Sequence, residues 1–114
     1  MLRGGRVRKN KHEVKLNSFE VGDDLIVVLT GGDKAHAGAV AVALPYKKTA
    51  CSSVISLPEH KDSDLAKPLA ERIAKKTKKR VIMIAGLHID NATEDDIYQL
   101  VKNSEKVVDE FIGA

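Results

Sequence analysis

The chain of 114 residues has no tryptophan, and aromatic residues make up only 4% of it. Its core must therefore be built from aliphatic side chains, which are plentiful because hydrophobic residues account for 43% of the sequence. No apolar run approaches the roughly 20 residues that a membrane-spanning helix needs. The basic N-terminus also lacks the apolar stretch of a secretory signal. We therefore expect a cytoplasmic protein, of a length that fits one compact domain.

Cysteine is almost absent too, since Cys51 is the only one. A single thiol excludes disulfides within the chain and zinc sites built on paired thiolates. Cys51 opens an apolar segment without the signature of a nucleophile, so we expect a buried structural thiol. Ser52 and Ser53 lie in the same segment, without a turn motif that would expose either hydroxyl. Because no paired acid and base stands out either, the sequence predicts a protein that is not an enzyme.

Positive charge is concentrated in two blocks, although the net charge is only +3. One block precedes residue 12, and the other lies at residues 72–80. Such clusters attract phosphate, nucleic acid or an acidic partner, but lysines also suit the C-terminal end of a helix. Nucleic-acid binding is disfavoured because the aromatic residues do not alternate with the charges. Residues 1–11 are expected to form a basic flexible arm, followed by a single domain at residues 12–114.

Four segments in the first half of the sequence have the composition of β-strands. They alternate apolar with polar residues or contain β-branched runs. Gly22 and Asp23 supply turn chemistry between the first two segments, while Pro45 and Pro58 are expected to end the third and fourth. Alternating Ala and Val in the third strand suggest that one of its faces lies close to a helix. The predicted strands cover residues 12–20, 24–30, 37–44 and 51–57.

The apolar spacing becomes helical after residue 62. Leu65, Leu69 and Ile73 recur at that spacing, and Ser63 is the expected N-cap. Pro68 is tolerated only in the first turn of a helix, so the regular helix is expected to begin near it.

A fifth strand is predicted at residues 80–86, before a second helix that Thr93 caps. An apolar stripe on this helix is expected to pack in the core, and it consists of Ile97, Leu100, Val101, Ser104, Val108 and Phe111. The connections between the early strands are too short for helices. The order β-β-β-β-α-β-α therefore indicates an α+β fold, with an antiparallel or mixed sheet of about five to six strands and two helices on one face.

Three of the four histidines lie just beyond predicted strands. If the second and third strands form a hairpin across residues 31–36, His36 lies at one end of the sheet. The third strand then runs away from this end and the fourth returns to it, which brings His60 there. The first helix and the fifth strand have similar lengths, so His88 should return to the same end. The three imidazoles are thus expected to be neighbours.

This end of the sheet has features of an anion site. Gly31, Gly32 and Gly38 would let backbone N–H groups approach a phosphate closely, and Lys34 and Lys61 add positive charge. The pattern is neither a Walker loop nor a dinucleotide fingerprint.

Two other interpretations of the same residues remain open. Three imidazoles can hold Zn²⁺ and leave a coordination position free, although no two of these histidines share a short ligand spacing. Alternatively, the glycines merely allow turns and the histidines bond to loop carbonyls.

Three motifs carry a family resemblance: Gly31-Gly32-x-x-x-His36-x-Gly38, Leu57-Pro58-Glu59-His60-Lys61-Asp62 and Ala85-Gly86-Leu87-His88-Ile89-Asp90. With them the chain resembles the small accessory subunit of gallate decarboxylase, an LpdD-like family of prenylated-flavin chaperones, from about residue 12 onward. The resemblance implies an accessory protein that binds prenylated flavin mononucleotide (FMN), or FMN itself, and delivers it to a UbiD-like decarboxylase large subunit. Glu59 departs from the glycine expected there, and its carboxylate would oppose a phosphate.

A more distant likeness is to the proteasome-assembly chaperones. It is carried by the helical segment at residues 65–77 and by Ala41-Val42-Ala43-Leu44-Pro45. It implies a similar fold, a homodimer and, as an alternative function, a protein-only assembly chaperone. A third alternative is a small metal-dependent enzyme that uses the three histidines. For the favoured flavin function, the expected cofactor-binding residues are Gly31, Gly32, His36, Gly38, His60, Lys61 and His88.

Overall fold

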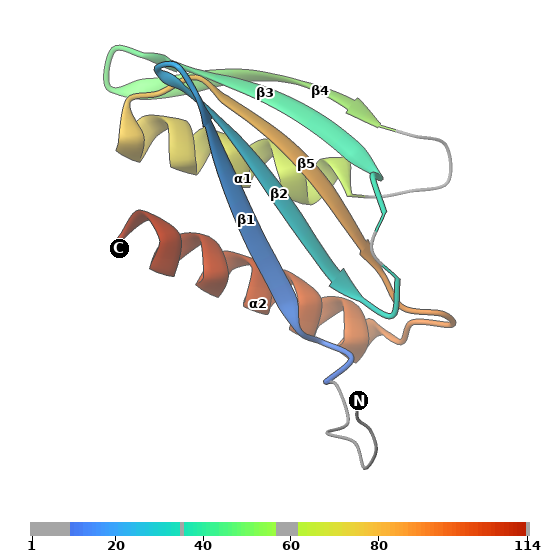
Figure 1. The fold of residues 1–114 in the computed structure, drawn as a ribbon. Helices are drawn as coiled ribbons and strands as arrows, with labels where there is room; N and C mark the ends of the chain where they lie inside the picture. Colours follow the sequence, from blue (N-terminus) through green and yellow to red (C-terminus); the bar gives the residue numbers. More distant parts are fainter. Residues whose placement is uncertain (1–9, 35, 57–61, 114) are drawn as a thin grey trace.

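The computed structural model describes residues 10–34, 36–56 and 62–113, which form a five-stranded sheet with two helices on one face (Figure 1). The elements are β1 (Val14–Val21), β2 (Asp24–Gly32), β3 (Ala39–Tyr46), β4 (Thr49–Ser56), α1 (Ser63–Thr77), β5 (Val81–His88) and α2 (Glu94–Ile112). The predicted α+β class and element order are confirmed. Several predictions fall outside the described residues. They concern most of the basic arm, the strand end expected at Pro58, and His60 and Lys61.

The strand order is β1-β2-β5-β3-β4. The sheet is mixed because β2 and β5 are parallel while the other neighbouring strands are antiparallel. β1 and β2 form the predicted hairpin, and β3 and β4 form a second one. The hairpin predicted between β2 and β3 is wrong, because β5 lies between them, parallel to β2 and antiparallel to β3. The central position suits β5, which is apolar on both faces, whereas β1 and β4 at the edges carry more polar residues.

One face of the sheet packs against both helices. α1 lies on β3, β4 and β5, and α2 lies on β1 and β2. Alternate residues of each central strand point to this side, as the buried Val27, Met83 and Ala41 illustrate. The three alanines of β3 at 39, 41 and 43 are almost fully buried and let α1 approach closely, as the alternating Ala and Val predicted. Large-to-small changes in such a core typically cost about 2–5 kcal/mol.

The start of α1 differs from the prediction. The helix begins at Ser63 with Asp62 as its N-cap residue, so Pro68 lies in the second turn and not near the beginning. Proline there cannot donate to the Asp64 carbonyl. Both residues are exposed, so water can solvate that carbonyl. The side chain of Asp62 makes no capping hydrogen bond to α1, and it is used elsewhere.

The start of α2 is as predicted. Thr93 and Asp96 form a capping box in which each side chain accepts a hydrogen bond of 3.0 Å from the other residue's backbone N–H. The second oxygen of Asp96 lies 2.8 Å from the ring of His12. Further along, Leu100 and Val108 are buried, but Ile97, predicted in the same stripe, is 54% exposed. The buried stripe is narrow because α2 lies at the edge of the sheet.

Because of the capping box, the free energy of unfolding should decrease at acidic pH. The hydrogen bond from the Thr93 backbone, and then that from His12, hold the pKa of Asp96 below its ordinary value. A carboxylate with a lowered pKa in the folded state stabilises the protein above about pH 4 and loses that contribution as the pH falls further. We expect Asp96→Asn to flatten the decline of the unfolding free energy below about pH 4, measured by urea titration at a series of pH values. The exposed neighbour Asp95→Asn is the control, and equal slopes for the two variants would contradict this account.

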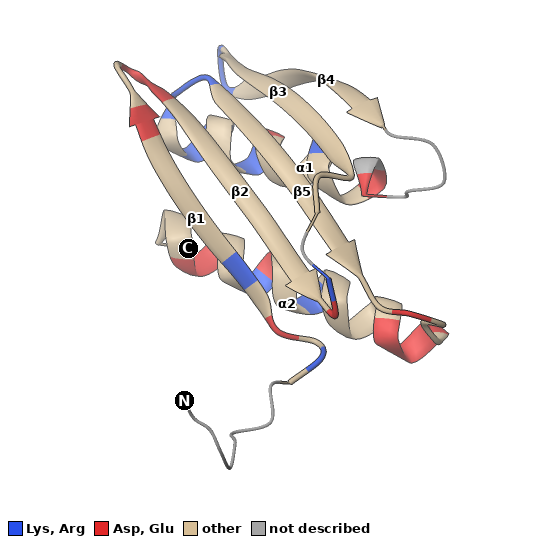
Figure 2. Ribbon diagram, turned by 45° about the vertical axis from the view of Figure 1, so that its right-hand side comes forward, with Lys and Arg blue, Asp and Glu red and all other residues tan. Residues whose placement is uncertain are grey.

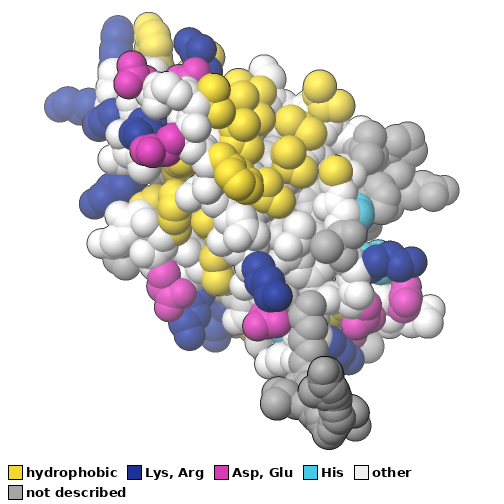
Figure 3. Space-filling model, in the orientation of Figure 1, with side chains coloured by type: hydrophobic (Ala, Val, Ile, Leu, Met, Phe, Trp, Pro, Cys, Tyr) yellow, Lys and Arg dark blue, Asp and Glu magenta, His cyan; other side chains and the backbone are white. Residues whose placement is uncertain are grey.

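The other face of the sheet is not covered by either helix, and we call it the open face. Figure 2 shows that the strands carry few charged residues along their length, with charge mainly near their ends. Figure 3 shows hydrophobic side chains gathered over the sheet on this side. Strand register and exposure assign to the open face Phe19, Val21, Ile26, Val28, Val40, Val42, Leu44, Cys51, Ile55, Ile82 and Ile84.

Cys51 corrects a prediction, because its thiol is exposed and not buried. It lies opposite Leu44 on the open face, while the next residue, Ser52, faces α1. At this point of β4 the residue that faces the helix is thus Ser52 and not Cys51. Neither described helix is long and apolar enough to cross a membrane.

Candidate functional site

His36 and His88 lie together at one end of the sheet. Their ring centroids are 6.1 Å apart, and the rings are nearly perpendicular. β2 and β5 run parallel toward this end and β3 runs away from it, so the predicted strand directions hold although the predicted hairpin does not. The meeting of these two histidines is confirmed. The place of His60 beside them stays a prediction.

Asp62 is the site residue that sequence reasoning missed. Its side chain is only 8% exposed, and one carboxylate oxygen lies 3.4 Å from His36 Nε2. The other oxygen accepts a hydrogen bond of 3.1 Å from the backbone N–H of Leu87 in β5. A buried carboxylate needs such partners. The sequence held a weak signal for this role of Asp62. Asp62 and Ser63 are adjacent and both can cap a helix, so one of the two was available for another role.

Two glycines allow the chain to close around this pair. A Cβ at Gly86 would overlap the backbone carbonyl oxygen of His36, and a Cβ at Gly38 would overlap the Asp62 carboxylate. The segment before β3 therefore crosses directly over Gly86, which places the His36 ring beside Asp62. Only glycine leaves room for these approaches.

The predicted anion-binding glycines already have partners within the sheet. The N–H of Gly38 donates to the Ala85 carbonyl at 2.8 Å, and that of Gly32 donates to Glu13 at 3.3 Å. A side chain at Gly31 would meet the Glu13 carbonyl, and one at Gly32 would meet the His88 carbonyl. In this structure these glycines bring neighbouring segments together.

Each of the two imidazoles lies beside a carboxylate, His36 beside Asp62 and His88 beside Asp90. His88 Nε2 lies 2.8 Å from Asp90 Oδ1, and the backbone N–H of Asp90 donates to the side chain of Asp33 at 3.2 Å. The exposed Lys34 contributes its backbone carbonyl, 3.3 Å from His36 Nδ1. Within the described ranges, no three His, Cys, Asp or Glu side chains are placed to share a metal ion. The described part of the site is therefore rich in hydrogen-bond acceptors and is not strongly cationic.

An apolar pocket adjoins Asp62 on the helix side. It has a volume of about 170 Å³ and lies between the start of α1, the end of β5 and the first half of α2. In the described part of the chain its lining includes Asp62 and the aliphatic side chains of Leu65, Leu87, Ile97, Leu100 and Val101. Asp62 thus joins this pocket to the histidine pair, so that polar recognition and apolar burial are available side by side.

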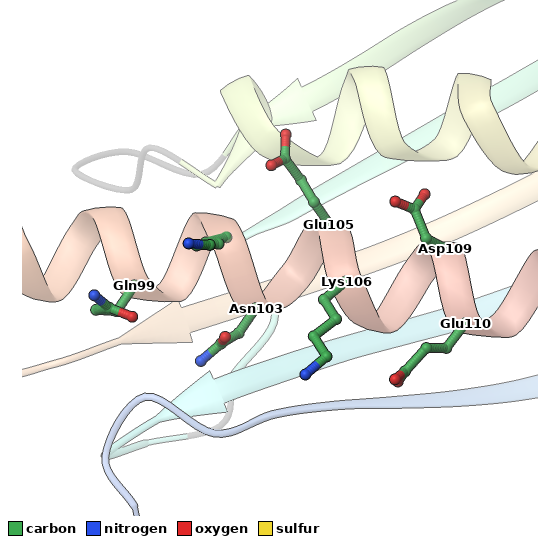
Figure 4. Close-up of a pocket in the computed structure, with 7 residues that line it drawn as sticks. Gln99, Asn103, Glu105, Lys106, Asp109 and Glu110 are labelled. Carbon is green, nitrogen blue, oxygen red and sulfur yellow. The ribbon is translucent and has the colours of Figure 1, made fainter. Parts of the chain in front are cut away.

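A larger hollow, of about 530 Å³, lies on the outer side of α2. Figure 4 shows that its side chains spread to both sides of the helix, with Glu105 and Asp109 toward α1 and Lys106 and Glu110 toward β1. Long side chains of both signs that do not converge on one point are typical of a solvated surface. We assign no ligand to it.

A serine, a lysine and a glutamate meet between β4 and α1. Lys67 Nζ donates to Ser52 Oγ at 2.8 Å and to Glu71 Oε2 at 2.7 Å, and the Ser52 hydroxyl also donates to Glu71. Hydrogen bonds from Lys67, then from Ser52, lower the pKa of Glu71. A serine nucleophile needs a neighbouring base that is able to take its proton, whereas this carboxylate is stabilised in its charged form. The cluster therefore anchors an edge strand to α1.

A family model described as the prenylated flavin chaperone LpdD-like domain matches residues 8–114. No curated protein matches the chain. The matched range includes every strand and helix described above, together with the histidine pair and Asp62. The chain therefore belongs to the LpdD-like family of prenylated flavin chaperones.

Proposed function

We propose that this protein binds prenylated FMN, or FMN itself, at the His36–His88 end of the sheet and delivers it to a UbiD-like decarboxylase large subunit. The observation that carries the proposal is that Asp62 contacts His36 of the histidine pair and also lines an apolar pocket. Family membership supports the chaperone role. In this role the protein holds and releases the flavin and does not transform it.

The described residues suit the ring system of a flavin better than its phosphate. An isoalloxazine has apolar faces, carbonyl oxygens and a ring N–H. Imidazoles can donate to the carbonyls, and the Asp62 carboxylate can accept from the N–H. A phosphate near Asp33, Asp62 and Asp90 would meet three carboxylates. We therefore propose that His60 and Lys61, and not the described residues, hold the phosphate.

The predicted glycines belong to the same proposal in a modified role. Gly31, Gly32 and Gly38 act by allowing neighbouring segments to approach, as Gly86 does. This proposal does not need their backbone N–H groups to donate to the phosphate, because those of Gly32 and Gly38 already donate hydrogen bonds to backbone carbonyl groups.

We further propose a homodimer formed through the open face. Five strands about 4.8 Å apart and about eight residues long present roughly 600 Å² per copy, which gives a total of about 1,200 Å². That is the lower end of the range for specific interfaces. The same apolar face favours the second candidate function, a protein-only assembly chaperone, which would bind its client through this surface without a flavin.

A flavin titration tests the binding site. We expect the double variant His36→Ala and His88→Ala to bind prenylated FMN about tenfold more weakly or worse, since two hydrogen bonds of about 1 kcal/mol each are lost. Flavin fluorescence and absorbance report the binding. His12→Gln is the control, because His12 pairs with Asp96 at the start of α2. Failure of the wild type to bind either flavin, or equal affinity of the double variant, would reject the proposal and favour the protein-only function.

A further inference from the structure

The pocket beside Asp62 has the size of a small hydrocarbon group and not of a whole flavin. A cavity of about 150 Å³ lined by aliphatic side chains stays dry and accepts benzene. The pocket here has a similar volume, about 170 Å³, but it is partly open to solvent. A tricyclic isoalloxazine is much larger than benzene and cannot enter it entirely. A hydrocarbon portion of the size of one isoprene unit can, including one that is fused to the edge of the flavin.

Apart from Asp62, the described walls of the pocket are aliphatic and suit a hydrocarbon group. Leu100 is 7% exposed and forms part of the buried wall, whereas Ile97 is 54% exposed and lies at the rim. Among the lining residues that the structure describes, Asp62 is the one polar residue. Its two oxygens face Leu87 N–H and the His36 ring, so the polar edge of the pocket is its junction with the histidine pair.

We propose that this pocket receives the isoprene-derived part of prenylated FMN while the flavin rings lie at His36 and His88. The inference rests on the proposed function and deepens it, because it explains how the protein distinguishes prenylated from unmodified FMN. Each methylene group that the pocket removes from water raises affinity roughly fourfold. We therefore expect the wild type to prefer prenylated FMN over FMN by about tenfold or more.

Filling the pocket should remove this preference. Val101→Trp places a bulky side chain in the lining, and Ile97→Asp places a charge at the exposed rim, where it should not prevent folding. Either variant is expected to lose about tenfold or more in affinity for prenylated FMN while affinity for FMN stays within about twofold. Tyr98→Trp is the matched control, since Tyr98 is an exposed residue of α2 outside the lining. It should leave both affinities unchanged.

Three outcomes separate this inference from the proposed function. Loss of the preference in both pocket variants, with normal binding in the control, supports the inference. Equal weakening of both flavins, or no change, overturns it while the proposed function stands. If the wild type binds no flavin, the proposed function fails, and an NMR titration with 3-methylbut-2-en-1-ol decides whether the pocket takes hydrocarbon. Shifts of the Leu87, Leu100 and Val101 methyl signals would show that the pocket binds hydrocarbon, and unmoved signals would show that it does not.

Discussion

Val42→Glu is expected to convert the proposed homodimer into monomers. Val42 lies in β3 near the middle of the open face, opposite Ile82 of β5 and Ser53 of β4. In a symmetric dimer through this face the substitution introduces two charges, one from each copy, into an apolar contact. An unpaired buried charge costs several kcal/mol, so the dimer should weaken by about 100-fold or more. Sedimentation or light scattering at a series of protein concentrations measures the change.

A matched surface substitution controls for the added charge. Tyr98→Glu also replaces an exposed large residue with a carboxylate, but on α2, away from the open face. It should leave the dimer intact. A wild type that stays monomeric up to millimolar concentration, or a Val42→Glu variant that stays dimeric, would contradict the homodimer. In the first case the open face would be available to a different partner, such as the decarboxylase subunit.

Gly86→Ala is expected to lower the free energy of unfolding by about 2–3 kcal/mol or more. The added methyl group would overlap the carbonyl oxygen of His36, so two backbone segments would have to separate, and overpacking against rigid atoms typically costs about 1–3 kcal/mol. Urea unfolding measures the loss. Because the crossing segment also positions the His36 ring, flavin affinity should fall with stability.

Gly22→Ala provides the comparison for this substitution. Gly22 has a φ of +61° in the turn between β1 and β2, but, its two chain neighbours aside, no heavy atom of the described residues lies within 4 Å of a Cβ built there. The left-handed backbone alone costs roughly 1 kcal/mol for alanine. If Gly86→Ala were no more destabilising than Gly22→Ala, the close crossing over β5 would not be present in solution.

The secondary structure was predictable because its signals are local. The caps, the turn at Gly22 and the two periodicities of apolar residues lie within short windows, and most strand boundaries agree to within about two residues. The order of the strands was not predictable in this way. Insertion of β5 between β2 and β3 depends on the apolar character of both its faces, and a hairpin across residues 31–36 was equally compatible with the local sequence.

The prediction that His36 and His88 meet is correct despite the wrong hairpin, and the reason is physical. β3 runs opposite to β2 whether the two strands are neighbours or are separated by β5, so His36 and His88 reach the same end in either topology. Asp62 was missed because an aspartate before a helix is usually a cap. Its role depends on Leu87, which is distant in sequence. Cys51 was misplaced because β4 points Ser52 toward the polar cluster on α1, against the usual burial of apolar residues.

The structure of the protein in complex with prenylated FMN tests the central claim most directly. The account predicts the flavin rings against His36 and His88, the isoprene-derived carbons in the pocket between α1 and α2, and the Asp62 carboxylate within hydrogen-bonding distance of the ligand. A flavin bound on the open face, or one bound with His36 and Asp62 out of contact with it, would contradict the account.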